Sequence, residues 1–158
     1  MFTGIIHAIG KINAIDEHGA DSRFIFNTGS MDLSDLNVGD SIAVNGACLT
    51  LIDKDENSFA ADISNETLKR TTFSKLEAGS SINLEKAMQL SDRLNGHMVS
   101  GHVDGIGKVS CLGDDGRSVC YTIVVPKALN RYLSKKGSVT VDGVSLTINA
   151  VEENTFRV

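Results

Sequence analysis

The chain has 158 residues, of which 41% are hydrophobic and 22% charged, as expected for one ordinary globular domain or two small ones. Its net charge of −5 and aromatic content of 5% argue against nucleic acid, which needs a concentrated positive face or aromatic stacking platforms. No window approaches the roughly twenty apolar residues that span a bilayer, and the start, MFTGIIHAIG, lacks the basic and apolar regions of a signal peptide.

The first half of the chain carries two local structural signals. In SIAVNGACLTLI, the dipeptide Asn45-Gly46 separates two short runs rich in β-branched residues, which strongly indicates a β-hairpin. In SNETLKRTTF, Ser64 or Asn65 can cap one turn of helix, because their side chains satisfy the free amides at a helix start. These signals predict a β-rich unit with little helix.

The second half has a similar organisation. The stretch KVSCLGDDGRSVCYTIVV predicts a hairpin that turns on Gly113 to Gly116. The stretch PKALNRYLSKKG predicts a short helix over 126–137, with proline in its first turn and glycine after its end. The stretch SVTVDGVSLTIN, from Ser138, predicts a hairpin like the earlier one, with Asp-Gly in its turn.

An internal duplication is the most specific signal in the chain. Gly4 corresponds to Gly101 at an offset of 97 residues (101 − 4), and three further blocks agree at the same spacing. They are 9–11 with 106–108, 41–51 with 138–148, and 56–59 with 153–156. Gly39 and Gly137 are 98 residues apart, which predicts one inserted residue at this point of the second copy.

The duplicated short strands and Gly-rich turns predict two small all-β barrels or sandwiches. We place an N-terminal unit at 1–90, a linker at 91–97 and a C-terminal unit at 98–158. The second copy has no counterpart of 62–87, so we expect its barrel to be incomplete and the chain to be a fragment or a truncation. A unit without its last strands would expose a sheet edge with unpaired backbone groups.

Alternation along the hairpins predicts one polar and one apolar face in each copy. In the first copy Cys48 and Thr50 lie opposite Ala47, Leu49 and Leu51. In the second copy Ser145 and Thr147 lie opposite Val144, Leu146 and Ile148. For one isolated hairpin, contact with water is the better explanation of such a polar face, but its recurrence in both copies favours a pair of matching pockets.

Two histidines, His97 and His102, stand in the glycine-rich stretch NGHMVSGHVDGIGKV. Their spacing of five places them on opposite faces of a strand, and about 140° apart on a helix, so they do not converge on a metal. His102 and Asp104 would share a strand face, where the carboxylate could fix the imidazole tautomer; a solvated histidine in a turn is an equally good interpretation. A Ser-His-Asp hydrolase is weakly supported, because no G-x-S-x-G elbow is present.

The two copies differ in their reactive groups. Cys48, Cys111 and Cys120 lack the spacing of a disulfide framework, as expected of reduced cytoplasmic thiols. The offset places Cys48 opposite Ser145, and His102 opposite Ile5. Matching pockets with unequal side chains would bind two copies of one ligand and treat them differently, which is the logic of a dismutation.

Five motifs in order resemble the riboflavin synthase family (alpha chain) over the whole chain: MFTGI, NGACLT, NETL, SGHVDG and DGVSLT. The resemblance implies an all-β fold of two tandem six-stranded Greek-key β-barrels, of which the second is incomplete here. It implies a cytoplasmic transferase that dismutates two molecules of 6,7-dimethyl-8-ribityllumazine to riboflavin and 5-amino-6-(D-ribitylamino)uracil, the last step of riboflavin biosynthesis. It implies no cofactor and no metal, a homotrimer whose sites form between barrels of neighbouring subunits, and lumazine synthase as a further partner.

The resemblance also assigns residues to two lumazine-binding pockets. The first would contain Gly4, Ile5, Ile6, Ser41, Cys48, Leu49, Thr50, Asp62, Ile63, Ser64, Asn65, Glu66 and Thr67. The second would contain Gly101, His102, Val103, Lys136, Ser145, Leu146 and Thr147. The catalytic residues would be His102, as base or proton shuttle, and Cys48 and Ser41, as hydrogen-bonding groups or as aids to addition at the acceptor ring.

Two alternatives remain at this stage. Lumazine proteins share the fold but hold one fluorescent ligand without turning it over, so the same motifs fit a non-catalytic lumazine- or flavin-binding protein. The presence of both Cys48 and His102 in their motifs favours the enzyme. A generic β-barrel binding module would have no affinity for the lumazine.

Overall fold

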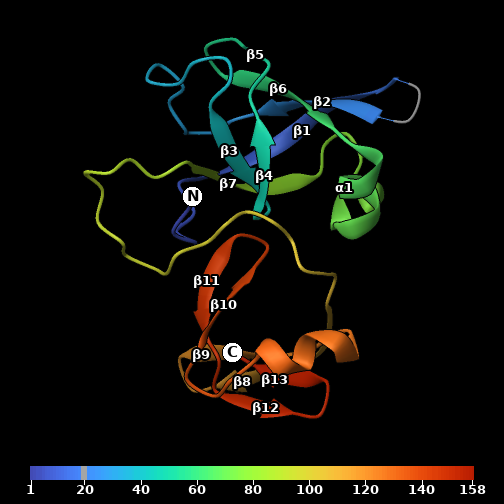
Figure 1. The fold of residues 1–158 in the computed structure, drawn as a ribbon, viewed down its shortest axis with the longest axis vertical. Coiled ribbons are helices and arrows are strands. Elements are labelled where there is room, and N and C mark those ends of the chain that lie inside the picture. The colour runs from blue at the N-terminus through green and yellow to red at the C-terminus, as the bar shows by residue number, and fades with distance from the viewer. Residues whose placement is uncertain (19–20) are drawn as a thin grey trace.

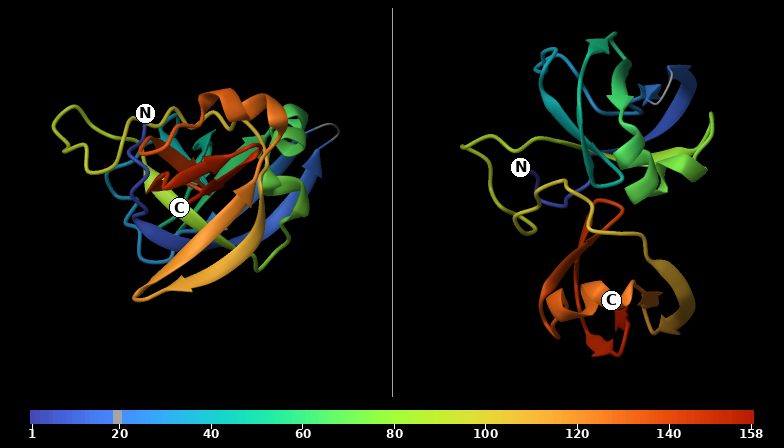
Figure 2. Two further views of the ribbon diagram at one scale, coloured as in Figure 1. Left: turned by 90° about the horizontal axis from the view of Figure 1, so that it is seen from below. Right: turned by 45° about the vertical axis from the view of Figure 1, so that its right-hand side comes forward.

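The computed structural model describes residues 1–18 and 21–158. It consists of two β-rich units, drawn one above the other in Figure 1, and the chain between β7 and β8 passes between them (Figures 1 and 2). The N-terminal segment lies at the same junction. This arrangement places two segments, at 1–7 and 96–107, where the two units meet.

The first unit is a seven-stranded antiparallel sheet with the order β4-β3-β7-β1-β2-β6-β5. Its strands are β1 (Ala8–His18), β2 (Asp21–Asn27), β3 (Ser41–Val44), β4 (Ala47–Thr50), β5 (Asp53–Lys54), β6 (Ser58–Ile63) and β7 (Ser81–Lys86). Only Leu51 and Ile52 separate β4 from β5, which stand at opposite ends of the strand order. The sheet therefore curls until its two ends meet, and forms a barrel.

Aromatic side chains fill this barrel. Phe26 and Phe59 are almost completely buried, with ring centroids 4.9 Å apart. Phe73, from the 3-10 helix η1 (Thr72–Lys75), contacts Phe24 edge-on at 5.6 Å. The helix α1 (Asn65–Arg70) precedes it and is capped by Ser64, as the sequence predicts. Together α1 and η1 cover one end of the barrel and extend its apolar core.

The second unit has a more open architecture. Its strands are β8 (Lys108–Asp115), β9 (Ser118–Val124), β10 (Ser138–Val141), β11 (Val144–Thr147), β12 (Ala150–Glu152) and β13 (Thr155–Arg157). They form a two-stranded sheet, β10-β11, and a four-stranded sheet, β12-β13-β9-β8. In the first unit β7 joins β3 to β1, and the described part of the second unit has no strand in that position. Its buried core is correspondingly small: Ile123, Ile148 and Phe156.

The structure confirms the duplication strand by strand. The bounds of β9, β10 and β11 lie 97 residues beyond those of β2, β3 and β4. The same irregularity interrupts both long hairpins, between Ile12 and Ala14 and between Val109 and Cys111. A pattern of bulges and registers shared by two halves reflects one ancestral unit.

The prediction of one inserted residue near Gly137 is wrong. Gly39 has φ 99° and its amide donates to Leu51 O at 2.8 Å, while Lys136 has φ 67° and its amide donates to Ile148 O at 2.7 Å. These two positions are 97 residues apart, so the turn is conserved in geometry without an insertion. The sequence comparison failed because Lys136 occupies a left-handed position where glycine is the usual residue.

Two local predictions need smaller corrections. The helix predicted over 126–137 is a 3-10 helix, η2 (Lys127–Tyr132), for which Pro126 is the N-terminal flanking residue. Gly137 instead belongs to the turn that precedes β10. The hairpin predicted to turn on Gly113 to Gly116 turns only after Asp115, at residues 116–117, because Gly113 is paired within β8.

Candidate functional site between the barrels

The segments that precede the first strand of each barrel, residues 1–7 and 96–107, are called the leading segments below. Each of them contacts the opposite barrel. Phe2 N donates to Val99 O at 2.8 Å, and Val99 N donates to Phe2 O at 3.0 Å. These residues are 97 positions apart and pair antiparallel, so they lie near the axis that relates the two units. Phe2 is fully buried at this junction.

Beyond this pair, each leading segment binds the hairpin of the opposite barrel. Ser145 N donates to Gly4 O at 2.7 Å, and Cys48 N donates to Gly101 O at 2.8 Å. The structure therefore groups the predicted residues differently from the sequence-based prediction. Gly4 lies with Ser145 of the second barrel, and Gly101 lies with Cys48 of the first.

The exchange requires glycine at both crossing points. Gly4 and Gly101 have φ values of 76° and 81°, which L side chains rarely adopt. A Cβ on Gly101 would stand 2.6 Å from Cys48 Cβ, and a Cβ on Gly4 would stand 2.7 Å from Ser145 Cβ. The two glycines thus let backbone approach the potentially reactive side chains of the other barrel.

The outward face of the first hairpin carries the polar residues predicted for the first pocket. Cys48 and Ser41 are half-buried and Thr50, which pairs with Ser41, is exposed. Leu49 and Ile63 point inward and are at most 5% exposed, so among the predicted binding residues these two could serve only through their backbone. The predicted alternation of faces is confirmed for this hairpin.

The segment 62–67 leaves the end of β6 beside this face. Ile52 N donates to Ala60 O at 2.9 Å, which sets β6 alongside the chain that follows β4. Ser64 Oγ accepts from Thr67 N at 3.2 Å and so fixes the first turn of α1. Asp62 receives a two-pronged hydrogen bond from Arg23, with Nε–Oδ1 2.8 Å and Nη2–Oδ2 3.1 Å, and this contact raises the pKa of Arg23.

The outward face of the second hairpin holds a histidine that the sequence-based site assignment omits. His97 Nδ1 lies 2.7 Å from Ser145 Oγ, and His97 Nε2 lies 3.0 Å from Thr140 Oγ1. Thr140 and Ser145 are cross-strand partners in β10 and β11. Lys136 is exposed, two residues before β10 begins, beyond the end of the hairpin that carries Ser145.

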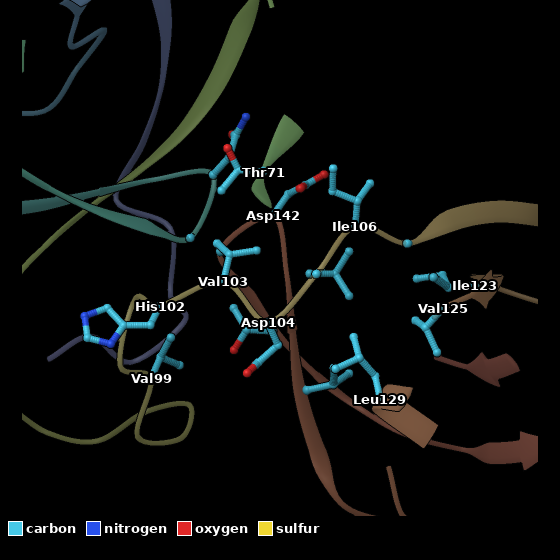
Figure 3. A pocket seen from close by; sticks show the side chains of 18 of the residues that line it. Thr71, Val99, His102, Val103, Asp104, Ile106, Ile123, Val125, Leu129 and Asp142 are labelled. Carbon is cyan, nitrogen blue, oxygen red and sulfur yellow. The ribbon is translucent and has the colours of Figure 1, made fainter. Parts of the chain in front are cut away.

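A cavity of about 600 Å³ opens between the stretch 97–107 and the interior of the second barrel. Figure 3 shows its apolar part, where Ile106, Ile123, Val125 and Leu129 gather, while the His102 imidazole extends away from them. The predicted strand that would align His102 with Asp104 is wrong, because residues 100–107 form no strand. His102 N instead donates to Ser100 Oγ at 3.2 Å.

The turns of the two short hairpins, β3-β4 and β10-β11, are in contact with each other. A Cβ on Gly46 would lie 2.8 Å from Gly143 N, so these turns pack backbone on backbone. Asn83 of β7 ties them together: its amide donates to Asn45 Oδ1 and its Nδ2 donates to Asp142 O, both at 2.8 Å. Asp142 is exposed as a residue, but partial burial of its carboxyl raises the pKa of that group above its ordinary value.

A buried carboxylate anchors the N-terminal segment. Glu85 is 2% exposed and accepts hydrogen bonds from Thr3 N at 2.6 Å, Thr3 Oγ1 at 2.7 Å and Gly4 N at 3.1 Å. Three donors satisfy a charge that would otherwise be costly to bury. Through this anchor, β7 of the first barrel positions the backbone that Ser145 contacts.

Residues 1–18 and 21–158 contain no cluster of three or more histidine, cysteine or acidic side chains able to hold a metal ion. None of the helices described in this structure is both long and apolar enough to cross a membrane. All three cysteines are free thiols.

Comparison with known proteins decides the family. A family model described as the lumazine binding domain matches residues 3–87 and again residues 100–158. A riboflavin synthase from Photobacterium leiognathi is 52% identical over 157 residues, which cover 99% of this chain and 72% of that protein. A riboflavin synthase from Bacillus subtilis (strain 168) is 42% identical over 158 residues, or 73% of its length. The chain belongs to the riboflavin synthase family.

Solved structures support the fold of this riboflavin synthase family member. The crystal structure of LumP complexed with riboflavin superposes with a TM-score of 0.90, covering 100% of this chain and 85% of that one. The complex of LumP with 6,7-dimethyl-8-(1'-D-ribityl) lumazine gives a TM-score of 0.87. Sequence identity is 24% in both cases, so this likeness establishes shared architecture alone.

The family motifs identified the segments that meet between the barrels, but the site residues assigned from them omitted three residues that hold those segments together. These are Phe2, Glu85 and His97, each of which bonds to or packs against a leading segment. The offset of 97 could have paired Phe2 with Val99. No local pattern indicates Glu85 or the His97 ring contacts, because their partners lie 82 and 48 residues away in sequence.

Proposed function

We propose that this chain is a riboflavin synthase subunit, which converts two molecules of 6,7-dimethyl-8-ribityllumazine into riboflavin and 5-amino-6-(D-ribitylamino)uracil by transfer of a four-carbon unit. The observation that carries the proposal is the 52% identity to a riboflavin synthase over 99% of this chain. The non-catalytic alternative is less well supported, because the LumP structures share only 23–24% identity with the chain.

The exchanged segments fit a reaction between two identical molecules. Each hairpin face, with the leading segment of the opposite barrel, forms one of two related cradles, and the two differ in bearing Cys48 or Ser145. Holding two flat rings in a fixed relation can supply roughly 7–11 kcal/mol of the barrier by proximity and orientation alone. Unequal side chains would let one molecule donate and its twin accept.

We assign three catalytic roles within this scheme. The 7-methyl group of the lumazine is acidic because its carbanion delocalises into the pteridine ring, and His102 would act as base or proton shuttle. Cys48 and Ser41 would bind the acceptor ring by hydrogen bonds or assist addition to it. The remaining predicted residues would form the binding surface: Gly4, Ile5, Ile6, Leu49, Thr50, Asp62 to Thr67, Gly101, Val103, Lys136, Leu146 and Thr147 together with Ser145.

We also propose that the chain assembles as a cytoplasmic homotrimer, with each complete site formed between barrels of neighbouring subunits, and that lumazine synthase is a further partner. Exposed apolar side chains within the exchanged segments support an assembly, since Ile5 and Met98 are 40% and 67% exposed. Light scattering on the purified protein should give three times the chain mass of 16.9 kDa. A monomer at working concentration would contradict this assembly.

The activity is tested by following riboflavin formation from the purified lumazine by absorbance. Two lumazine molecules should disappear for each riboflavin formed, with one equivalent of the diaminouracil product. The variant His102→Gln should lose about 100-fold or more in turnover if its imidazole moves the proton. Binding of the lumazine without any conversion would favour the non-catalytic alternative.

A further inference from the structure

We call the cradle that contains Cys48 the first and the one that contains Ser145 the second. The second differs from the first by more than the replacement of a thiol by a hydroxyl. Cys48 and Ser145 occupy equivalent positions, and the amide of each donates to the glycine carbonyl of the opposite leading segment. Ser145 Oγ is also held by an imidazole, that of His97, at 2.7 Å. Among residues 1–18 and 21–158, no imidazole is hydrogen-bonded to Cys48 in this way.

His97 is fixed at three points, two of them on its imidazole ring. Its backbone amide donates to Thr3 O at 3.0 Å, its Nε2 contacts Thr140 Oγ1 at 3.0 Å, and its Nδ1 contacts Ser145 Oγ. A neutral imidazole has one donor and one acceptor nitrogen, and a hydroxyl can fill either role, so both ring nitrogens are satisfied. The ring therefore bridges two cross-strand neighbours of the hairpin, Thr140 and Ser145.

The preceding residue must be glycine for this contact to form. A Cβ on Gly96 would lie 2.1 Å from Thr3 O and 3.1 Å from Ser145 Cβ. The N-terminal segment that carries Thr3 is itself fixed by Glu85. The Ser145 hydroxyl therefore lies where three parts of the chain meet: the linker with His97, the N-terminal segment with Thr3, and the hairpin β10-β11.

We infer that His97 is a positioning residue of the second cradle, which fixes the orientation of the Ser145 hydroxyl beside the molecule bound there. This inference rests on the proposed function, because it takes Ser145 as a ligand-binding group. A serine hydroxyl rotates freely about its C–O bond, and a hydrogen bond to a fixed ring nitrogen gives it a single direction. The two cradles then present different groups to identical substrates: a thiol without an imidazole partner in the first, and an imidazole-held hydroxyl in the second.

A double-mutant cycle tests the coupling between the two side chains. His97→Ala should lower kcat between about twofold and tenfold, the range expected for one net hydrogen bond. In the Ser145→Ala background the same change should have no further effect on kcat, because the hydroxyl to be oriented is gone. Losses that multiply in the double variant would overturn the inference.

Two further variants separate positioning from a merely structural role. His97→Asn places an amide near the site of Nδ1 and should recover part of the activity lost in His97→Ala; no recovery would count against the inference. His7→Ala is the matched control, because within the described parts of the chain the His7 ring accepts a hydrogen bond from a backbone amide alone, that of Lys86, at 3.2 Å. It should retain wild-type kcat, and an equal loss there would contradict a specific role for His97.

A measurement without turnover separates this inference from the proposed function. The ring ¹⁵N signals of His97 should shift in Ser145→Ala and stay unchanged in Cys48→Ser. Unchanged signals in Ser145→Ala would overturn the inference even in an active enzyme. Shifted signals in a protein that makes no riboflavin would uphold the contact and refute the enzyme.

Discussion

Glu85 accepts a 2.6 Å hydrogen bond from the backbone amide of Thr3, a residue 82 positions away in sequence, and the carboxylate is almost fully buried. Glu85 belongs to β7 of the first barrel, while the segment it holds reaches across to Ser145 of the second. The first barrel therefore supplies and positions the N-terminal segment that forms one side of the cradle around Ser145. This relationship makes the folding of the first barrel a condition for the geometry of the second site.

Glu85→Ala should lower the free energy of unfolding by about 2–4 kcal/mol, because two buried amides and a hydroxyl lose a charged acceptor. Urea unfolding measures the change. Glu66→Ala is the matched control, since Glu66 forms an exposed i,i+4 pair with Arg70 worth about 0.5 kcal/mol or less. Equal losses in the two variants would mean that the buried carboxylate does not anchor the segment.

Gly101→Ala should be destabilising for two reasons that a second glycine can separate. Gly79 has φ 92° with open space around its missing Cβ, so Gly79→Ala reports the conformational strain alone, about 1–2 kcal/mol. Gly101→Ala adds the contact with Cys48 and should cost about 1–3 kcal/mol more. Thermal unfolding of both variants gives the difference, and a Gly101→Ala protein no less stable than Gly79→Ala would contradict the close crossing.

Asp142→Asn should stabilise the protein at neutral pH. Because burial raises the pKa of Asp142 in the folded protein, the folded state binds this proton more tightly than the unfolded chain does. Stability contributed by the protonated form is present at low pH and is lost as the pH rises through the raised pKa. The gain from the substitution should therefore shrink as the pH falls from the raised pKa of Asp142 toward the ordinary aspartate pKa of 3.8, and it should be absent below that value. Urea unfolding of both proteins over a pH series measures it, and a gain independent of pH would exclude this origin.

Cys48→Ser should lower the rate of riboflavin formation by about tenfold or more, since a hydroxyl is less acidic and less polarisable than a thiol. The melting temperature should change little, because the side chain is half-buried and outside the core. Cys111→Ser on the exposed strand β8 is the control and should keep wild-type activity. Parallel losses in both variants would remove the assigned role of Cys48.

Much of the local structure was predictable because it depends on neighbouring residues. Asn45-Gly46 and Asp142-Gly143 form the expected turns, with φ values from 45° to 84° at all four positions. The alternation of Ala47, Leu49 and Leu51 with polar residues correctly gave the buried face of β4. The left-handed backbone of Lys136 could not be predicted in this way, because lysine gives no sign of that conformation.

The sequence alone determined that two copies of one β-unit follow each other 97 residues apart, with a thiol and a hydroxyl at equivalent positions. Only the tertiary structure decided that the leading segments cross, so that Gly4 lies with Ser145 and Gly101 with Cys48. The physical reason is that turns and strand faces arise from contacts within a few residues, which leave periodic patterns. A hydrogen bond between backbone groups 53 or 141 residues apart (101 − 48 and 145 − 4) leaves no such pattern, because any residue can supply an amide or a carbonyl.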